Sequence, residues 1–428
     1  MEVFEQHESA IRGYSRVYPV VFDTAENARQ TDINGKQYID FFAGAGVLNY
    51  GHNNPRMKQA MIHYLQSNGV THSLDMASRA KGEFIQAFVD TVLKPRGMTH
   101  KLQFMGPTGT NSVEAALKIA RRSTGRAEVV AFTKGFHGMT LGSLAATANT
   151  YFRNAAGVEL ANVTHLPFGC EKLCMGCNMG CGPAALDALG ARYADPSSSF
   201  KPPAAFLVET IQAEGGVNVA SKAWLQKLAA LAHKVGALLI VDDIQVGCGR
   251  TGTFFSFDEL GINPDVVCLA KGIGGMGTPM ALNLVKPEHD KHWSPGEHTG
   301  TFRGQNLSFV AGREALRYYE NSDLMNQVKH NAVLIREALE PLEKTLPNVQ
   351  VRGKGMIVGL DVGNTDLSKA IVADCFEKGL IVASCGTGGR VLKVIPPLTI
   401  PEPDLRQGLS ILVKCTQAAL ATTQGNAA

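Results

Sequence analysis

The middle of the chain alternates short apolar runs with longer segments whose apolar residues recur at helical spacing. Residues 222–234 are one such segment, and Ser221 before it is a suitable N-cap. This alternation is typical of βαβ units, which build a mostly parallel sheet covered by helices. The middle of the chain is therefore predicted to be α/β. Its strands are expected at residues 128–132, 205–208, 237–241 and 265–269.

The pattern changes towards the C-terminus. An apolar run at 356–362, a helix candidate at 368–378 and a glycine-rich turn at 386–389 follow one another. This mixture is typical of a smaller α+β domain packed on the large one. We expect three parts: an N-terminal segment of residues 1–50 that joins the small domain, a large domain of residues 51–324, and a small domain of residues 325–428.

The composition indicates a globular protein with a large core. Of the 428 residues, 45% are hydrophobic and 18% are charged, which excludes a disordered or fibrous chain. The formal net charge of +3 is spread without a basic block, so no nucleic-acid partner is expected. The N-terminus is acidic and no apolar run is long enough for a membrane span. We therefore expect a cytoplasmic location and no membrane partner.

Glycine clusters where the predicted strands end. In open parallel sheets a ligand binds beyond the carboxyl ends of the strands, where glycine lets the backbone approach it closely. Several loops are thus predicted to converge on one small molecule. The glycines concerned are Gly106, Gly109, Gly135, Gly138, Gly247, Gly249, Gly272, Gly274 and Gly275.

Residues 106–121 form a glycine turn that leads into a predicted helix. Asn111 and Glu114 have the spacing of a capping box, and Thr108 and Thr110 add hydroxyl donors. Free N–H groups and the helix dipole at such a position favour a bound phosphate. An ordinary capped helix is the alternative interpretation of this motif when it is taken alone.

Two ionisable residues end buried strands. Asp242 follows one apolar run, and a carboxylate there needs a cationic or hydrogen-bonding partner; a helix N-cap is the alternative. Lys271 follows another apolar run, and burial there would lower the proton affinity of its amine, which favours Schiff-base formation. The alternative is a lysine whose side chain extends to solvent. A phosphate-binding turn, an acid and a reactive amine together match the requirements of pyridoxal 5'-phosphate (PLP).

The motifs around these residues resemble those of the class III (ω-) aminotransferases, and the similarity extends over nearly the whole chain. The resemblance implies a PLP-dependent transferase of fold type I, with a mostly parallel central sheet in the large domain and a smaller α+β domain. It also implies a homodimer. The most specific motifs are VDDIQVGCGRTG, GPTGTNSVEAALKIAR, KGFHG, VETIQAEGG and GTFRGQN, with a step of 29 residues from Asp242 to Lys271.

The resemblance also implies which residues form the coenzyme site. Lys271 would be the Schiff-base lysine and Asp242 the partner of the pyridinium nitrogen, which makes these two the catalytic residues. Thr301 would reach the phosphate from the neighbouring subunit, so that a complete site needs a dimer. The remaining cofactor-binding residues would be Gly109 and Thr110 at the phosphate, Phe136 above the ring, Ile244 beneath it, Gln245 at the ring oxygen and His137 as a positioning residue.

Within the class, the chain most resembles the ectoine-pathway subgroup that transfers the amino group of L-glutamate to L-aspartate 4-semialdehyde, which gives L-2,4-diaminobutyrate and 2-oxoglutarate. The stretches YIDFFAGAGVLNYGHNNP and FMGPTGTNSVEAA carry much of this similarity. The open alternatives are a class III enzyme acting on ornithine, 4-aminobutyrate or a polyamine, and a racemase or decarboxylase of the same fold type.

Four residues are expected at the substrate. Glu209 lies in VETIQ, where many relatives have VEPIQ. Lys393 stands where ornithine and 4-aminobutyrate enzymes have an arginine that binds the 2-oxo acid carboxylate and pairs with the glutamate matching Glu214. Lysine lacks the bidentate fork of arginine, so we expect Arg303 to help hold the carboxylate; a surface arginine is the alternative.

Four cysteines form a dense C-x3-C-x2-C-x3-C group, which invites comparison with zinc and iron–sulfur sites. The spacing differs from the usual C-x2-C pairs of zinc sites, so we expect thiols and no metal. A metal-sensing or electron-transfer protein is the alternative function that this group would support. The cysteines are Cys170, Cys174, Cys177 and Cys181.

Overall fold

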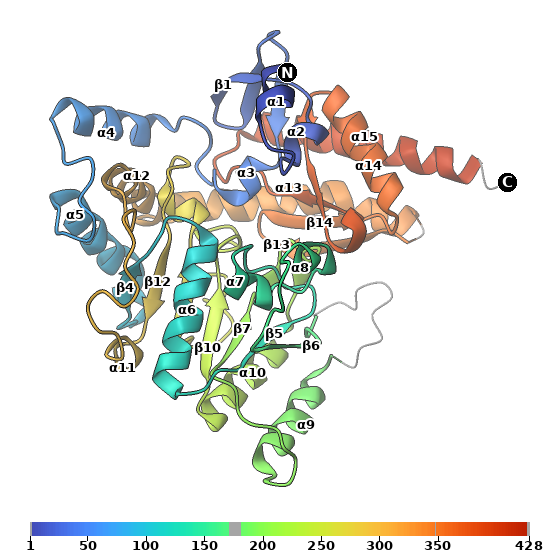
Figure 1. Ribbon diagram of the computed structural model, residues 1–428. Helices are drawn as coiled ribbons and strands as arrows, with labels where there is room; N and C mark the ends of the chain where they lie inside the picture. Colours follow the sequence, from blue (N-terminus) through green and yellow to red (C-terminus); the bar gives the residue numbers. More distant parts are fainter. Residues whose placement is uncertain (1, 171–180, 347, 426–428) are drawn as a thin grey trace.

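The computed structural model describes residues 2–170, 181–346 and 348–425. Its centre is a seven-stranded sheet in which every strand except β12 runs in the same direction (Figure 1). The predicted mostly parallel sheet is confirmed. The spatial order is β4 (Lys101–Phe104), β12 (Leu282–Val285), β11 (Val266–Leu269), β10 (Leu238–Asp242), β7 (Ala205–Val208), β5 (Val129–Phe132) and β6 (Val163–Leu166).

The four predicted strands form where the continuous apolar runs lie, because both faces of this sheet are buried. In β10, Leu238 and Ile240 pack in the cluster that contains α6 (Gly109–Thr124). Leu239 and Val241 point to the other face and pack in the cluster that contains α10 (Lys222–Val235). A strand between two helical layers has no polar face.

The helices around the large sheet follow the predicted periodicity where a prediction was made. In α10 the Ser221 hydroxyl accepts a hydrogen bond from the Trp224 N–H at 3.2 Å, so the predicted N-cap is confirmed. The other helices of this part are α4 (Pro55–Gln66), α5 (Arg79–Phe88), α7 (Leu141–Ala146), α8 (Thr150–Asn154), α9 (Pro183–Ala194), α11 (Pro287–Asp290) and α12 (Asn306–Leu316).

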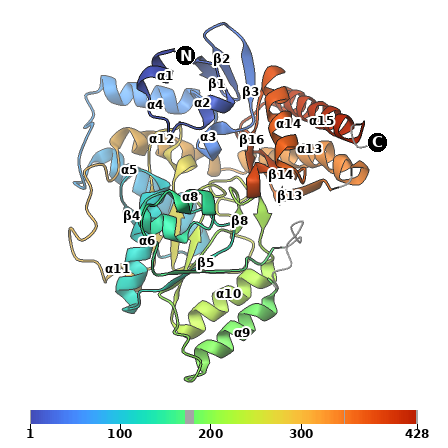
Figure 2. The same ribbon diagram turned by 45° about the vertical axis from the view of Figure 1, so that its right-hand side comes forward.

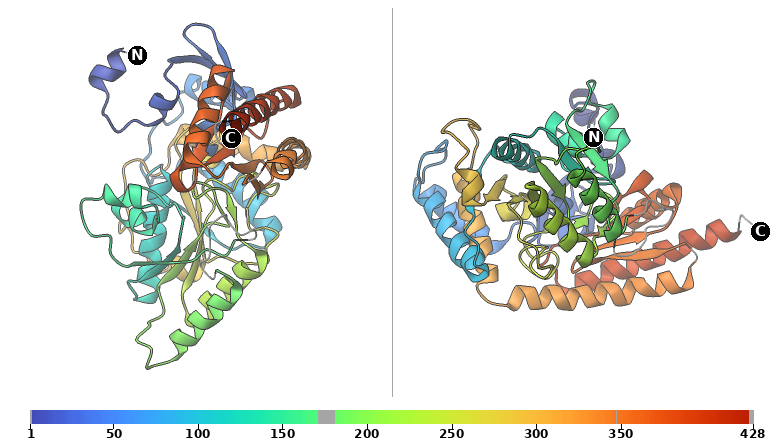
Figure 3. Two further views of the ribbon diagram at one scale, coloured as in Figure 1. Left: turned by 90° about the vertical axis from the view of Figure 1, so that its right-hand side faces the viewer. Right: turned by 90° about the horizontal axis from the view of Figure 1, so that it is seen from below.

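A second, antiparallel sheet lies in the C-terminal part, with the order β13 (Gln350–Lys354), β14 (Ile357–Asp361), β17 (Val391–Val394) and β16 (Ala383–Cys385). The helix expected at 368–378 is α14 (Thr365–Glu377). Helices α13 (Asp323–Thr345) and α15 (Glu402–Gly425) lie side by side along this part (Figure 3, right). The predicted mixture of strands and helices is observed.

The N-terminal strands join the C-terminal part. Strands β1 (Phe22–Glu26), β2 (Arg29–Asp32) and β3 (Gln37–Asp40) form a sheet with β15 (Leu380–Ile381), in which Ile39 is opposite Leu380. Figure 2 shows β1, β2 and β3 at the top of the molecule. One hydrophobic cluster contains residues from both regions. The domain boundaries near residues 50 and 325 stay predictions. The short elements are α1 (Glu2–His7), α2 (Tyr14–Val17), α3 (Ala43–Gly46), β8 (Ile211–Gln212) and β9 (Asn218–Val219).

None of the helices formed by the described residues is both long and apolar enough to cross a membrane.

Candidate active site

Four neighbouring parallel strands carry site residues to one edge of the large sheet. Asp242 is the last residue of β10, and Lys271 follows β11. Glu209 follows β7, and the Phe136-His137 pair lies beyond the end of β5. The strands are adjacent in the order β11, β10, β7 and β5, and their five residues line one cavity. The structure therefore brings together residues that are up to 135 positions apart.

Lys271 has the properties of a reactive amine. Its φ of +53° is in the left-handed region, which costs a non-glycine residue about 1–3 kcal/mol and is common at functional sites. Its side chain lines the cavity, and its Nζ has no hydrogen-bond or ion-pair partner among the described residues. Burial lowers the pKa of Lys271 to about 8; the Glu214 charge opposes this effect and the Lys393 charge adds to it. About one tenth of the amine is thus neutral at pH 7.

Asp242 is paired with His137 at the back of the cavity. Its Oδ2 lies 2.7 Å from His137 Nδ1, and the two side chains are 5% and 1% exposed. Burial alone lowers the pKa of His137, but the hydrogen bond and charge of Asp242 outweigh it, and the pKa is raised. The hydrogen bond from His137 therefore fixes the orientation of the Asp242 side chain at the back of the cavity.

Glu209, which was expected at the substrate, lines the cavity and binds the backbone on both sides of it. Its Oε1 accepts the Phe136 N–H at 3.0 Å, and its Oε2 accepts the Ala213 N–H at 3.2 Å. Burial raises the pKa of Glu209 to about 7, against the opposing charge of His137. Both carboxylate oxygens are engaged with the backbone, so this side chain joins the loop after β5 to the segment that carries Glu214.

Glu214 and Lys393 form an ion pair in which Lys393 Nζ donates to Glu214 Oε1. Lys393 Nζ also lies 3.2 Å from Gln245 Oε1, and Gln245 Nε2 donates to the carbonyl of Ala45 at 2.8 Å. Burial alone raises the pKa of Glu214, but the charges of Lys393 and Lys271 outweigh it and the pKa is lowered. Lys393 thus makes the pairing with Glu214 that the resemblance implies for an arginine at this position.

The N-terminus of α6 forms the opposite end of the cavity. The N–H groups of Gly109 and Thr110 have no partner among the described residues. Thr110 Oγ1 lies 2.7 Å from Thr140 Oγ1 and 2.5 Å from Ser143 Oγ. These N–H and hydroxyl groups are the donors that a phosphate requires, and the helix dipole favours its charge. The sequence motifs did not single out Thr140 and Ser143, although both follow closely on the Phe-His-Gly triplet.

The capping box expected at the start of α6 is wrong. The helix begins at Gly109 after Thr108, so Asn111 already lies in its first turn. The Asn111 amide oxygen accepts the Thr108 hydroxyl at 2.8 Å. Glu114 accepts the Ser143 N–H at 3.0 Å and so connects the helix to α7. The helix therefore begins earlier than the polar spacing indicates.

Apolar side chains flank the cavity between its two ends. Ile244 lies against Gly109: a Cβ at that glycine would be 3.1 Å from Ile244 Cδ1. Phe136 packs edge to face against Phe152, with the ring centroids 5.5 Å apart. The cavity therefore matches an aromatic ring that carries an aldehyde and a phosphate. The amine is in place for the aldehyde, the helix N–H groups for the phosphate, and the carboxylate and the apolar walls for the ring.

Two expected residues do not line this cavity in their own chain. Thr301 is exposed, and Arg303 lines a separate cavity, where its Nη1 lies 3.5 Å from Asp75 Oδ2. Arg303 therefore cannot assist Lys393 within one chain in this arrangement.

Cysteines 174 and 177 lie outside the described residues, whereas Cys170 is half-buried and Cys181 is buried. Within the described ranges, no group of three or more His, Cys, Asp or Glu side chains could hold a metal ion.

The chain is similar to one family model and to curated proteins that share one name. The family model described as aminotransferase class-III matches residues 11–416. The chain is 49% identical over 417 residues to the diaminobutyrate–2-oxoglutarate transaminase of Wolinella succinogenes, covering 96% of this chain and 95% of that protein. It is 47% identical over 422 residues to the enzyme of the same name from Oceanobacillus iheyensis, covering 98% and 97%.

A solved ornithine aminotransferase of Toxoplasma gondii, with partial occupancy of PLP at its active site, is similar in structure. It superposes with a TM-score of 0.83 at 26% identity, covering 98% of this chain and 94% of that one. The match to the family model and the relatives of nearly full length lead to the same assignment. The chain belongs to the class III aminotransferase family.

Proposed function

We propose that this protein is a PLP-dependent aminotransferase that moves an amino group between L-glutamate/2-oxoglutarate and L-aspartate 4-semialdehyde/L-2,4-diaminobutyrate with ping-pong kinetics. One observation carries the proposal: Lys271, without a polar partner among the described residues, lines the same cavity as the Asp242–His137 pair and the free N-terminus of α6. The substrate pair follows from the curated relatives, which are named diaminobutyrate–2-oxoglutarate transaminase.

PLP, when bound, supplies an electrophilic aldehyde and a ring that stabilises negative charge on the substrate carbon. Family membership and the PLP-containing structural neighbour support this coenzyme. Gly109 and Thr110 would hold the phosphate, Phe136 and Ile244 would enclose the ring, and Gln245 would lie near its oxygen.

Lys271 is the proposed acid and base. Its pKa of about 8 leaves part of the amine neutral at pH 7, and the neutral Nζ can accept a proton from the substrate carbon that bears the amino group. The same atom, once protonated, can return the proton to an acceptor carbon nearby. Asp242, held by His137, would face the ring nitrogen and keep it protonated.

The complete site is proposed to form in a homodimer, in which Thr301 of one subunit reaches the phosphate site of the other. The exposed position of Thr301, outside the cavity of its own chain, supports this arrangement. The cytoplasmic location expected from the sequence stays a prediction.

The decisive experiment is a coupled assay with purified protein, PLP and a panel of amino donors. We expect glutamate to form from 2-oxoglutarate with L-2,4-diaminobutyrate as donor, faster than with ornithine, 4-aminobutyrate or a polyamine. A higher kcat/KM with ornithine would replace the proposed substrate with one of its alternatives. Turnover of an amino acid without any oxo acid would indicate a racemase or decarboxylase, and a chelator-sensitive chromophore would indicate a metal cluster.

A further inference from the structure

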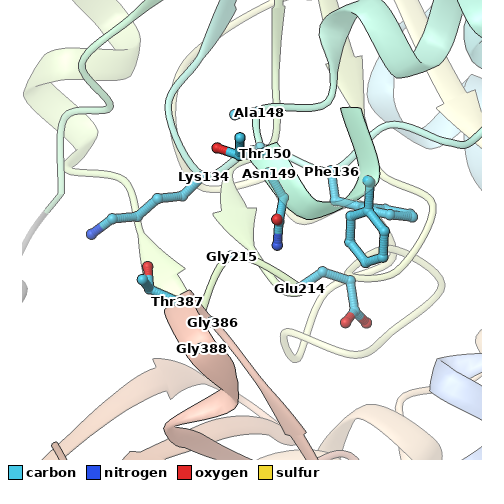
Figure 4. Close-up of a pocket in the computed structure, with 12 residues that line it drawn as sticks. Lys134, Phe136, Ala148, Asn149, Thr150, Glu214, Gly215, Gly386, Thr387 and Gly388 are labelled. Carbon is cyan, nitrogen blue, oxygen red and sulfur yellow. The ribbon is translucent and has the colours of Figure 1, made fainter. Parts of the chain in front are cut away.

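Glu214 lies at the border of two cavities. It lines both the coenzyme cavity and a neighbouring one, and Phe136 is the other residue that the two linings share. Figure 4 shows Glu214 and Phe136 at one side of the neighbouring cavity and the loop of Gly386, Thr387 and Gly388 at another, while Lys134 extends away from Glu214. A molecule that occupies both cavities therefore passes the Glu214 carboxylate.

Glu214 is the accessible carboxylate of this region. The other two carboxylates of the linings, Glu209 and Asp242, are 7% and 5% exposed, whereas the Glu214 side chain is 27% exposed. Glu209 is bound to two backbone N–H groups and Asp242 to His137. Glu214 is thus the group of the three that can take a further hydrogen-bond donor from a ligand.

Lys393 lies behind Glu214. Its side chain is 1% exposed, and it lines neither cavity. Two of the three N–H donors of the ammonium are directed to Glu214 Oε1 and Gln245 Oε1. Lys393 therefore holds Glu214 in place and charged, and in this arrangement it is shielded from a ligand by the two residues that it binds.

A partly exposed carboxylate with a fixed orientation is suited to an ammonium ligand. A diamino acid carries two amino groups, and when one is at Lys271 the other remains charged. Building on the proposed function, we propose that Glu214 binds the non-reacting α-ammonium group of L-2,4-diaminobutyrate, and that Lys393 and Gln245 are positioning residues for this carboxylate. The enzyme would thereby distinguish a diamino acid from 4-aminobutyrate, which has the same carbon chain and reacting amine but lacks the α-amino group.

The test compares Glu214→Gln with the wild type on both substrates. The ratio of kcat/KM for L-2,4-diaminobutyrate to that for 4-aminobutyrate should fall about 10- to 100-fold, the usual effect of one hydrogen bond to a charged group. If 4-aminobutyrate is not turned over, its competitive inhibition constant replaces kcat/KM in the ratio. Glu259→Gln is the matched control, because Glu259 pairs with Lys354 at the surface; its ratio should equal that of the wild type.

Two further variants separate positioning from folding. Lys393→Met should lower the same ratio, and Lys393→Arg should restore most of it, because the charge behind Glu214 returns. Each variant is accepted only if it binds PLP and unfolds at a temperature close to that of the wild type. An unchanged ratio in Glu214→Gln, or equal losses on both substrates, would overturn the inference. A wild type that does not accept L-2,4-diaminobutyrate would instead overturn the proposed function.

Discussion

His137 Nδ1 and Asp242 Oδ2 lie 2.7 Å apart although the residues are separated by 105 positions in the chain. The pair connects the loop after β5 with the end of β10, across the intervening strand β7. Because both side chains are buried, the hydrogen bond between them holds each in a fixed orientation. The histidine thus fixes the orientation of the acid that is proposed to face the ring nitrogen of the coenzyme.

Asp242→Asn should lower kcat by about 100-fold or more, because a neutral amide cannot stabilise a protonated ring nitrogen. His137→Asn should have a smaller effect, about tenfold, since Asp242 keeps its charge but loses one hydrogen bond to a charged partner. Steady-state kinetics with saturating PLP measure both values. A larger loss in His137→Asn than in Asp242→Asn would contradict this order of roles.

The pH dependence of coenzyme binding should report the pKa of Lys271. Only the neutral amine can react with an aldehyde, so the rate at which protein stripped of coenzyme takes up PLP should rise with pH through about 8. Stopped-flow absorbance at a series of pH values measures the inflection. A rate that is flat between pH 6 and pH 9 would show that Lys271 does not have the expected lowered pKa.

Two substitutions should move that inflection in opposite directions. Lys393→Met removes a positive charge that lowers the Lys271 pKa, so the inflection should move to higher pH. Glu214→Gln removes a negative charge that raises the Lys271 pKa, so the inflection should move to lower pH. Shifts of the same sign would mean that the two residues act on Lys271 through a change in structure and not through their charges.

The sequence predicted the sheet well because its central strands are continuous apolar runs. It also predicted that Asp242 and Lys271 end two of these strands, and the parallel sheet then brings the ends together. The side-chain pairings within the site were harder to predict from the sequence. Lys393 and Glu214 are 179 positions apart, and no local pattern shows that Gln245 binds Lys393 or that Glu209 binds two backbone N–H groups.

The start of α6 illustrates the limit of local patterns. Asn111 and Glu114 have capping-box spacing, but their oxygens bind the Thr108 hydroxyl and the Ser143 N–H instead. Ser143 comes from α7, so the competing partner is invisible in the segment itself. A local contact for Asn111 and a tertiary contact for Glu114 thus replace the capping box at the place where the phosphate is proposed to bind.

Gly138→Ala should weaken PLP binding. Gly138 has a φ of +133°, and an added Cβ would collide with Thr110 Oγ1 and lie 2.5 Å from Ser143 Oγ, both of which belong to the phosphate end of the cavity. We expect the Kd for PLP to rise at least tenfold, measured by fluorescence titration. Gly82→Ala in α5 is the control, because its Cβ would meet nothing within 4 Å and the helix should gain stability.

Asp265 lies at the end of the large sheet that is opposite the site. Asp265→Asn should destabilise the fold. Asp265 accepts the Leu239 N–H at 2.8 Å and pairs with Lys286 at 2.8 Å, so it joins the starts of β10 and β11. Burial alone raises its pKa, but the hydrogen bonds from His289, Lys286 and Leu239 outweigh burial and lower the pKa to about 2 from an ordinary value of 3.8.

An acid whose pKa is lower in the folded state stabilises the fold above its unfolded pKa, and this contribution is lost as the pH falls through the folded value. Asp265→Asn should therefore lower the free energy of unfolding by about 2 kcal/mol at pH 7, and the difference from the wild type should narrow as the pH falls below about 4. Urea unfolding at several pH values measures this difference. Asp187→Asn, at an exposed pair with Lys227, should change little at any pH. A difference for Asp265→Asn that is as large at pH 3 as at pH 7 would assign the effect to lost packing and not to the charge of Asp265.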